Sequence, residues 1–481
     1  MKKVLRKTKI VGTIGPASES PEMLEKLFNA GLNVTRINFS HGGYEENGEK
    51  IENIKKTRKK LNRPVALLLD TKGPEIRTGM LVTGKNEKIT IEEGQEFTFV
   101  NEEITGDNTK VSISYKELYK DVSVGGTLLV DDGALEFEIV EIRGKDIVCK
   151  ALNTGKLGSR KTMNVPGVKV DLPALTQKDI DDITEGIKRG FDYIAASFVR
   201  KASDVIALRT LLDENGGERV KIISKIENQE GIDNFEEILA LSDGIMVARG
   251  DMGVEIPMEQ VPIVQKRFIK RCNQVGKPVI TATQMLESMT SNPRPTRAEV
   301  SDVANAVYDK TGAIMLSGEC AMGKYPVECV DVMSRISKAI EAETHYWTRF
   351  NRYAKSYDFS NIESHIAYTT IATAQNMNAA GIVAYTKTGD SIRKLAGFPC
   401  QCPIFAITDD EKTFNQLAVS VNVCPILVEG TSSIEETIKK GIERIKADEL
   451  VESGDIVVIS GGAKVLSSVD NNKTFAGMLR I

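Results

Sequence analysis

Short apolar runs rich in β-branched residues alternate with amphipathic stretches over most of the chain, and this alternation predicts parallel strands joined by crossover helices. Helix-patterned segments such as 21–30 and 259–275 separate the runs. The strand-like runs are residues 8–12, 34–39, 65–70, 193–198, 221–226, 244–248, 278–281 and 313–316. Eight such units indicate an α/β protein built on a (β/α)₈ TIM barrel, in which functional groups collect at the carboxyl ends of the strands.

The pattern changes between residues 75 and 165. Segments 88–91, 96–99 and 135–139 alternate strictly between apolar and polar side chains, with Gly, Asn and Asp at the breaks. This alternation predicts half-buried antiparallel strands. Because the module interrupts the third strand–helix unit, we expect an inserted antiparallel β-barrel lid at the mouth of the larger barrel. Pro166 and Pro173 predict a stiff hinge where the chain returns.

A final α/β unit follows a charged helix and a polar link at residues 356–360. Its strand-like runs are residues 381–385, 403–408, 424–427 and 455–460. These runs predict a small doubly wound C-terminal domain. The expected organisation is a barrel domain of residues 1–74 and 166–343, a lid of residues 75–165 and a C-terminal regulatory domain of residues 344–481.

Composition narrows the classes of function. The chain has 481 residues, a formal net charge of −4 and interspersed charges, which argue against a nucleic-acid-binding face. Its apolar runs are strand-sized, far short of a bilayer span, so we expect no membrane association. Seven scattered cysteines without a Cys-x-x-Cys pair favour a reducing, cytoplasmic environment.

Charged residues cluster at two neighbouring strand ends. Lys225 and Glu227 are two residues apart, so they project from the same face, and Asp251 follows the next apolar strand. Two carboxylates and one ammonium leave a negative excess that suits Mg²⁺ or Mn²⁺ carrying phosphate. An internal Lys225–Glu227 ion pair is the alternative. Gly250 and Asp251 begin a helix-opening turn, whose N–H groups can hold an anion. The pattern predicts phosphoryl transfer.

A second cluster lies at the ends of the second and third predicted strands. Arg36, Asn38 and Ser40 share one strand face and offer a guanidinium for phosphate with an amide and a hydroxyl for a cation. The alternative is a polar layer that the barrel interior tolerates. Asp70 ends the third run where barrels keep catalytic groups, and Thr71 follows it.

Two further sites rest on weaker patterns. Thr283 follows the seventh run and could place a hydroxyl over the barrel axis, although helix capping explains it about as well. A hydroxyl-rich turn in the last domain could bind a phosphate-bearing effector, and ordinary N-capping explains part of it. The residues of this turn are Thr386, Lys387, Thr388, Gly389 and Ser391.

Several motifs in order resemble those of the pyruvate kinase family, from residue 6 to the last domain. They are TKIVGTIGP (8–16), RINFSHG (36–42), DTKGPEIRTG (70–79), ISKIEN (223–228), ARGDMGVE (248–255), ATQMLESM (282–289) and NPRPTRAE (292–299). The resemblance implies transfer of a phosphoryl group from phosphoenolpyruvate to ADP, giving pyruvate and ATP in glycolysis, with Mg²⁺ (or Mn²⁺) and K⁺ as cofactors.

The resemblance also implies a role for each matching residue. Arg36 would grip the transferred phosphoryl group, and Lys225 would neutralise charge on it and on the enolate oxygen. The N–H groups of Gly250 and Asp251 would receive the substrate carboxylate. Thr283 would help to protonate enolpyruvate.

Metal and nucleotide ligands follow from the same motifs. Mg²⁺ would be held by Glu227 and Asp251. K⁺ would be coordinated by Asn38, Ser40, Asp70 and the carbonyl of Thr71. The nucleotide side would comprise Asn38, His41, Arg77 and Lys201.

Two positions refine these expectations. Glu75 resembles the K⁺-dependent branch of the family, whereas a lysine there would supply its own charge. Asp390 replaces a basic residue that members activated by fructose 1,6-bisphosphate often carry, and residues 466–473 replace their glycine-rich loop. A carboxylate beside a phosphate pocket is unfavourable, so we expect a monophosphate effector, such as a sugar phosphate or nucleotide, or none. The family's usual form is a homotetramer.

Two alternatives remain at this point. One is a metal-dependent pyruvate-enolate lyase or aldolase on a similar barrel, and the other is a non-catalytic metabolite-binding homologue. The insert after Asp70, with Arg36 and Lys225 placed for a phosphate, argues against the first. The presence of every expected ligand argues against the second.

Overall fold

The computed structural model describes residues 5–40, 42–84, 87–355, 362–461 and 475–481. His41, the link at 356–360 and the segment 466–473 named above lie outside these ranges. Within them, eight parallel strands close into a barrel, each beside the next in the chain. The strands are β1 (Lys9–Thr13), β2 (Val34–Asn38), β3 (Ala66–Asp70), β13 (Tyr193–Ala196), β14 (Lys221–Ile226), β15 (Gly244–Ala248), β16 (Val279–Ala282) and β17 (Ala313–Leu316). All eight predicted strands are confirmed.

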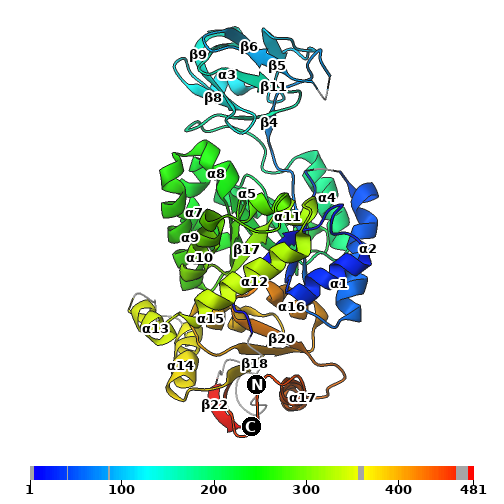
Figure 1. Ribbon diagram of the computed structural model, residues 1–481, viewed down its shortest axis with the longest axis vertical. Helices are drawn as coiled ribbons and strands as arrows, with labels where there is room; N and C mark the ends of the chain where they lie inside the picture. The colour runs from blue at the N-terminus through cyan, green and yellow to red at the C-terminus, as the bar shows by residue number, and fades with distance from the viewer. Residues whose placement is uncertain (1–4, 41, 85–86, 356–361, 462–474) are drawn as a thin grey trace.

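Helices cover the outside of the barrel (Figure 1). Helix α1 (Pro21–Ala30) illustrates how the sequence sets their ends: the Ser20 hydroxyl accepts a hydrogen bond from the N–H of Met23, and Gly31 ends the helix at φ 113°. Other covering helices are α2 (Tyr44–Lys60), α4 (Gln177–Lys188), α5 (Ala202–Glu214), α7 (Phe235–Leu241), α9 (Val261–Val275), α10 (Arg297–Tyr308) and α12 (Pro326–Ala342). Their apolar faces and the outward strand residues form the largest core.

The insert is a β module packed around its own apolar core. In the described part of the insert, seven strands form one mainly antiparallel sheet in the order β4-β12-β8-β9-β10-β6-β7, and β5 pairs with β11. The strands are β4 (Ile76–Arg77), β5 (Ile89–Ile91), β6 (Glu96–Val100), β7 (Lys110–Ser112), β8 (Thr127–Val130), β9 (Leu135–Arg143), β10 (Asp146–Ala151), β11 (Gly155–Leu157) and β12 (Thr162–Asn164).

The two edges of the curled sheet of the insert are joined by a β-bridge. Its outer strands β4 and β7 are joined next to their ends by an antiparallel bridge between Thr78 and Ile113, so the expected barrel is completed by a bridge and not by a full ladder. The β6–β7 pair is parallel, which the prediction of an antiparallel module did not anticipate. A short helix, α3 (Leu118–Asp121), follows β7.

The last domain is a sheet with helices on both faces. Its strand order in the described residues is β20-β19-β18-β21-β22, in which the final strand is antiparallel to its neighbour. The elements are α13 (Tyr346–Ala354), α14 (Ile362–Asn376), β18 (Gly381–Tyr385), α15 (Asp390–Gly397), β19 (Ile404–Thr408), α16 (Glu411–Gln416), η3 (Leu417–Val419), β20 (Val423–Leu427), α17 (Ile434–Ala447), β21 (Ile456–Gly461) and β22 (Phe475–Arg480). Four of these strands were predicted, and β22 was missed.

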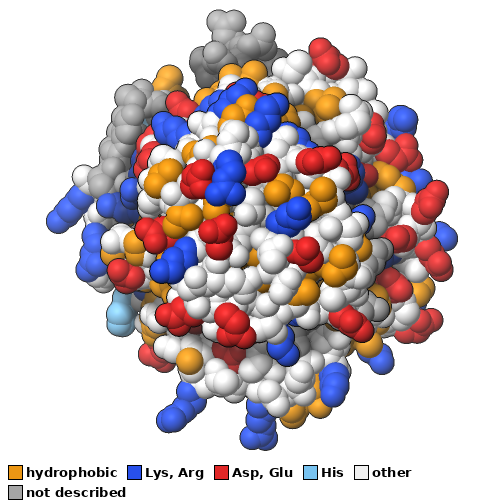
Figure 2. Space-filling view, turned by 90° about the horizontal axis from the view of Figure 1, so that it is seen from above, with side chains coloured by type: hydrophobic (Ala, Val, Ile, Leu, Met, Phe, Trp, Pro, Cys, Tyr) orange, Lys and Arg blue, Asp and Glu red, His pale blue; other side chains and the backbone are white. Residues whose placement is uncertain are grey.

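The three parts are stacked along the long axis, with the insert at one end, the barrel in the middle and the last domain at the other end (Figure 1). Ala418 and Val419 of η3 pack with the interior residues of the barrel and so plug its amino-terminal end. The carboxyl-terminal end faces the insert. Acidic and basic side chains are interspersed on the end seen in Figure 2. Among the described residues, no helix combines the length and apolar character needed to span a bilayer.

Candidate active site

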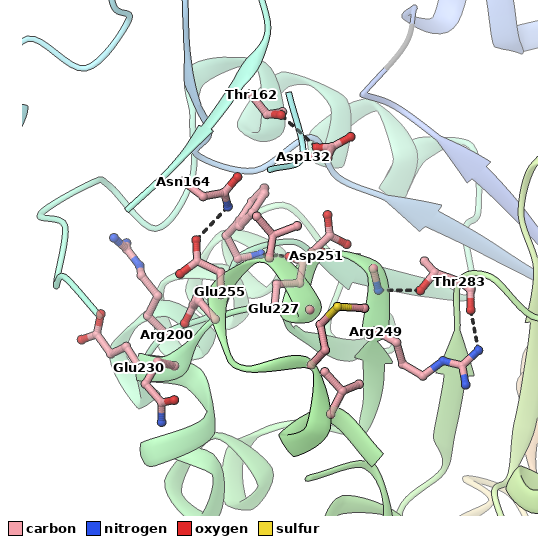
Figure 3. Close-up of a pocket in the computed structure, with 18 of the residues that line it drawn as sticks. Asp132, Thr162, Asn164, Arg200, Glu227, Glu230, Arg249, Asp251, Glu255 and Thr283 are labelled. Atoms are coloured by element: carbon pink, nitrogen blue, oxygen red, sulfur yellow. Dashed lines mark hydrogen bonds between the residues drawn. The ribbon is translucent and has the colours of Figure 1, made fainter. Parts of the chain in front are cut away.

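A cavity of about 950 Å³ lies at the carboxyl ends of the barrel strands, below the insert. Residues of both parts line it (Figure 3). The barrel contributes Phe198, Arg200, Glu227, Arg249, Gly250, Asp251, Glu255, Thr283 and Ser317, and the insert contributes Asp132, Thr162, Met163 and Asn164. A cavity of this size and position suits small-molecule chemistry covered by a lid.

A chain of buried ion pairs runs beneath this cavity. The Nζ atom of Lys225 lies 2.9 Å from Oε1 of Glu227 and 3.1 Å from Oδ1 of Asp70. The guanidinium of Arg36 contacts the other oxygen of Asp70 at 2.5 Å and donates to the hydroxyl of Thr13 at 2.8 Å. The ion pair held above as an alternative therefore exists, but it belongs to a larger network that links three strands.

The network fixes the charge of its members. Burial disfavours the charged form of Lys225, but the neighbouring carboxylates, Asp70 first, outweigh burial and raise its pKa. Burial also opposes ionisation of Asp70, yet Arg36 and then Lys225 hold its pKa below the usual value. The ammonium of Lys225 therefore stays charged and fixed in place, as electrostatic catalysis requires.

Glu227 differs from Asp70. Burial raises the pKa of the Glu227 carboxyl to about 7, because the charge of Lys225 offsets burial only in part and the nearby charge of Asp251 adds to it. One of its oxygens accepts a hydrogen bond from the N–H of Phe198, which orients the carboxylate. The exposed Asp251 lines the cavity beside it. A cation between these two carboxylates would favour the ionised form of both.

The donor set fits a magnesium ion that is shared with a ligand. Among the described residues, no group of three or more His, Cys, Asp or Glu side chains is placed to hold a metal ion by itself. Mg²⁺ is usually held by one or two carboxylates and completed by water and substrate phosphate oxygens. Glu227 and Asp251 supply such a pair.

The residues expected to coordinate K⁺ meet at the ends of β2 and β3. Asn38 is opposite Asp70 in the parallel register, and the N–H of Phe39 donates to the Asp70 carbonyl. The amide oxygen of Asn38 accepts a hydrogen bond from the N–H of Ser40 at 3.1 Å. Asn38 and Asp70 thus end neighbouring strands beside the ion-pair network, and Ser40 and Thr71 follow them closely in the sequence.

Ser197 connects the two groups, and the sequence analysis did not single it out. Its hydroxyl accepts a hydrogen bond from Lys225 at 2.8 Å, donates to the Thr71 carbonyl at 2.7 Å and lies 3.2 Å from Asp70. A signal for it was available, because Ser197 has the parity of the interior residues Tyr193 and Ala195. A polar residue at that position ends an otherwise apolar strand.

Thr283 and Gly250 are in contact across the cavity rim. The hydroxyl of Thr283 accepts a hydrogen bond from the N–H of Gly250 at 2.8 Å and donates to the carbonyl of Ala282 at 2.6 Å. Thr283 has φ 66°, a left-handed conformation that is unusual for a β-branched residue. Arg249, at the start of α8 (Arg249–Glu255), donates to its carbonyl at 2.6 Å. In this structure the Gly250 N–H, which is expected to receive the substrate carboxylate, is engaged by the Thr283 hydroxyl.

Two residues assigned to the nucleotide side, Arg77 and Lys201, lie outside the lining of the cavity. Arg77 pairs with Glu75 at 2.5 Å and donates to the carbonyl of Arg160, within the insert. Lys201 is exposed and precedes α5. His41 lies outside the described residues.

The turn at residues 386–391 lies in the last domain, at the start of α15. The Thr386 hydroxyl accepts a hydrogen bond from the N–H of Gly389 at 2.9 Å. The Asp390 carboxylate accepts hydrogen bonds from the hydroxyl of Thr388 at 2.7 Å and from Arg393 at 2.9 Å. A carboxylate of the chain thus already occupies donors that an anion would use.

Comparison with known proteins agrees with this geometry. The chain matches the barrel domain of pyruvate kinase over residues 5–330 and the alpha/beta domain of pyruvate kinase over residues 364–473. A pyruvate kinase of Clostridium acetobutylicum is 49% identical over 459 residues, which cover 95% of this chain and 96% of that relative. One of Staphylococcus epidermidis is 49% identical over 460 residues, or 95% of this chain and 78% of the relative. The crystal structure of a pyruvate kinase from Cryptosporidium parvum aligns with a TM-score of 0.93 at 40% identity, covering 99% of this chain and 96% of that one. The chain belongs to the pyruvate kinase family.

Proposed function

We propose that the cavity binds phosphoenolpyruvate and ADP and transfers the phosphoryl group between them, giving pyruvate and ATP. The protein is a phosphotransferase of glycolysis by its family. The observation that carries the assignment to this cavity is the Lys225 ammonium, which is held by Asp70, Ser197 and Glu227 beside the exposed carboxylate of Asp251. A fixed positive charge beneath a cavity of this size suits a reaction in which negative charge moves between two substrates.

In this proposal the residues of the ion-pair network bind the phosphoryl group and stabilise the charge that develops during its transfer. Arg36 grips the phosphoryl group, and Lys225 stabilises the charge that builds on the phosphoryl group and on the enolate oxygen. Glu227 and Asp251 hold Mg²⁺ or Mn²⁺, which when bound supplies positive charge to phosphate oxygens. The close pairing of Arg36 with Asp70 keeps the guanidinium oriented before substrate arrives.

Thr283 and the first turn of α8 position the three-carbon part of the substrate. The hydroxyl of Thr283 lies at the rim where the enolate would be protonated, so it places or relays that proton. The N–H groups of Gly250 and Asp251 hold the substrate carboxylate after the Thr283 hydroxyl turns away from Gly250. Asn38, His41, Arg77 and Lys201 make up the nucleotide side.

A potassium ion completes the site at the strand ends. Its ligands are Asn38, Ser40, Asp70 and the Thr71 carbonyl. The position of Asn38 opposite Asp70, which pairs with Arg36, supports this assignment, because a monovalent cation there would add positive charge close to the phosphoryl group.

Further properties follow from the family. We propose a homotetramer acting in the cytoplasm, with the barrel formed by residues 1–74 and 166–343, the lid by 75–165 and the regulatory domain by 344–481. The turn containing Thr386, Lys387, Thr388, Gly389 and Ser391 is the candidate effector site. Because Asp390 already binds Thr388 and Arg393, the effector is a monophosphate or is absent.

Pyruvate formation from phosphoenolpyruvate and ADP tests the function directly. We expect turnover that requires ADP and Mg²⁺, and that falls sharply when Na⁺ or tetramethylammonium replaces K⁺ and recovers when K⁺ returns. Equal turnover without K⁺ would refute the potassium site. Pyruvate release from phosphoenolpyruvate that does not require ADP would mean that the phosphoryl group passes to water, and it would contradict transfer to ADP.

A further inference from the structure

The insert is tied to the barrel through the loop that follows β13, residues 197–200. Arg200 ends this loop and is 5% exposed. Its guanidinium donates to the carbonyls of Val170 at 2.7 Å and Leu172 at 2.5 Å, which belong to the segment that returns from the insert to the barrel. A planar guanidinium can bond two carbonyls at once, so it fixes both the position and the direction of this segment.

The return segment moves with the insert because it packs against the core of the insert. Val168, Val170 and Leu172 contact that apolar core. The return segment also follows Asn164, whose amide donates to Glu255 of α8 at 2.7 Å across the cavity (Figure 3). Holding the carbonyls of Val170 and Leu172 therefore sets where the cavity-lining residues of the insert lie.

Arg200 is itself held firmly by the barrel. Its N–H donates to the carboxylate of Asp204 at 3.0 Å, its carbonyl accepts from the side chain of Asn234 at 2.9 Å, and its Nε lies 3.6 Å from Asp204. The buried Nε has no hydrogen-bond partner, so the other guanidinium nitrogens carry the contacts to the return segment.

The same loop contacts the segment that leaves the barrel for the insert. Gly73 lies against the loop so closely that a Cβ atom there would come within 2.7 Å of the Ser197 side chain and 2.8 Å of Phe198. Ser197 and Phe198 are the residues that bind Lys225 and Glu227. Four consecutive residues thus join the reactive groups to both connections of the insert.

We propose that Arg200 is a positioning residue that holds the insert over the cavity in register with Lys225 and Glu227 during phosphoryl transfer. The proposal rests on the function proposed above. It assigns to Arg200 no contact with the substrate: the side chain acts through the carbonyls of Val170 and Leu172. Loss of the Arg200 side chain loosens the attachment of the insert and leaves Lys225 and Glu227 in place.

The test compares Arg200→Met, Arg200→Lys and the parent as the full chain. Arg200→Met keeps an unbranched apolar stem and removes the donors, and we expect kcat/KM for ADP to fall on the order of 100-fold, since small misplacements of positioning groups cost that much. Arg200→Lys keeps the charge but cannot bond both carbonyls, so it should recover part of the loss. Arg209→Met is the control, because Arg209 lies on the following helix α5 and pairs with Asp243.

Two measurements distinguish a positioning role of Arg200 from a folding defect of the variant and from failure of the proposed function. Amide hydrogen exchange of residues 165–173 should quicken in Arg200→Met without any substrate, whereas Mn²⁺ binding to the free enzyme should stay within about twofold of the parent because the barrel still holds Glu227 and Asp251. If Arg200→Met fails to fold, Arg200→Lys carries the test. Unchanged exchange at 165–173, or a kcat/KM within about twofold of the parent in a folded variant, overturns the proposal.

Discussion

Replacing Lys225 by Met removes the positive charge at the centre of the ion-pair network while keeping a side chain of similar length. A substrate oxygen at the distance that Lys225 keeps from Glu227, 2.9 Å, would interact with the ammonium by roughly 6 kcal/mol at an effective dielectric constant of about 20. Arg36 and the bound cations share the developing charge, so we expect a net loss of about 4 kcal/mol, or about a 10³-fold fall in kcat. Substrate KM should change little, because the charge is needed most in the transition state.

The variant should still fold. Removing one partner of a buried ion pair often costs about 3–5 kcal/mol, because it leaves an unpaired charge. Here Arg36 continues to pair with Asp70, and Glu227 can take up a proton because its pKa is already raised to about 7. Thermal unfolding measured beside kcat separates the two effects.

Lys221→Met provides the matched control. Lys221 begins the same strand and pairs with Asp243 at 3.0 Å, away from the cavity. We expect its kcat to stay within about twofold of the parent, as for other partly exposed pairs. A folded Lys225→Met enzyme that retained kcat within about tenfold of the parent would refute the assignment of the fixed charge.

Three further outcomes test other parts of the site. Because burial raises the Glu227 pKa from 4.5 to about 7, ionising this group opposes folding, so its contribution to stability falls as pH rises through this window. Protonation of Glu227 also competes with metal binding, so the affinity of the protein for Mn²⁺ should weaken about tenfold per pH unit below pH 7 and become constant above it. Titrations of Glu227→Gln with Mn²⁺ should not show this pH dependence. Ser197→Ala should lower kcat about tenfold, because the Lys225 ammonium and the Thr71 carbonyl each lose a hydrogen bond worth about 1–2 kcal/mol. Steady-state kinetics equal to those of the parent would contradict this prediction. Glu75→Lys should reduce the activation by K⁺ measured against tetramethylammonium, and undiminished activation would argue that residue 75 does not set the cation requirement.

Most of the barrel strands could be predicted from sequence because they are short, mainly apolar runs, buried on both faces and separated by helix-patterned segments. Strand β22 could not, because Phe475–Arg480 contains a glycine and lies at the sheet edge with exposed side chains at Met478 and Leu479. The parallel β6–β7 pair was missed for another reason. Alternation of side chains gives the faces of a strand, but not the direction of its neighbour.

The site itself was predicted as a set of residues, whereas its connections were not. Parity placed Lys225 beside Glu227, and the structure confirms that contact. Nothing in the local pattern indicates that Asp70 bridges Lys225 and Arg36, because that contact joins strands far apart in sequence. The hydrogen bond from Gly250 to Thr283 was missed for the same reason.

The charges of the network predict that the proposed reaction requires cations. The carboxylates of Asp70, Glu227 and Asp251 face the positive charges of Arg36 and Lys225, so the protein alone leaves an excess of one negative charge in a largely buried place. Burial makes that excess unfavourable, and burial is also the main reason that the pKa of Glu227 is raised. A polyanionic substrate would add to the excess and be repelled. A divalent ion between Glu227 and Asp251, with a monovalent ion beside Asp70, would reverse the sign of the site. The same carboxylates that disfavour phosphate in the protein alone would then bind it through the cations, which makes substrate binding conditional on metal binding.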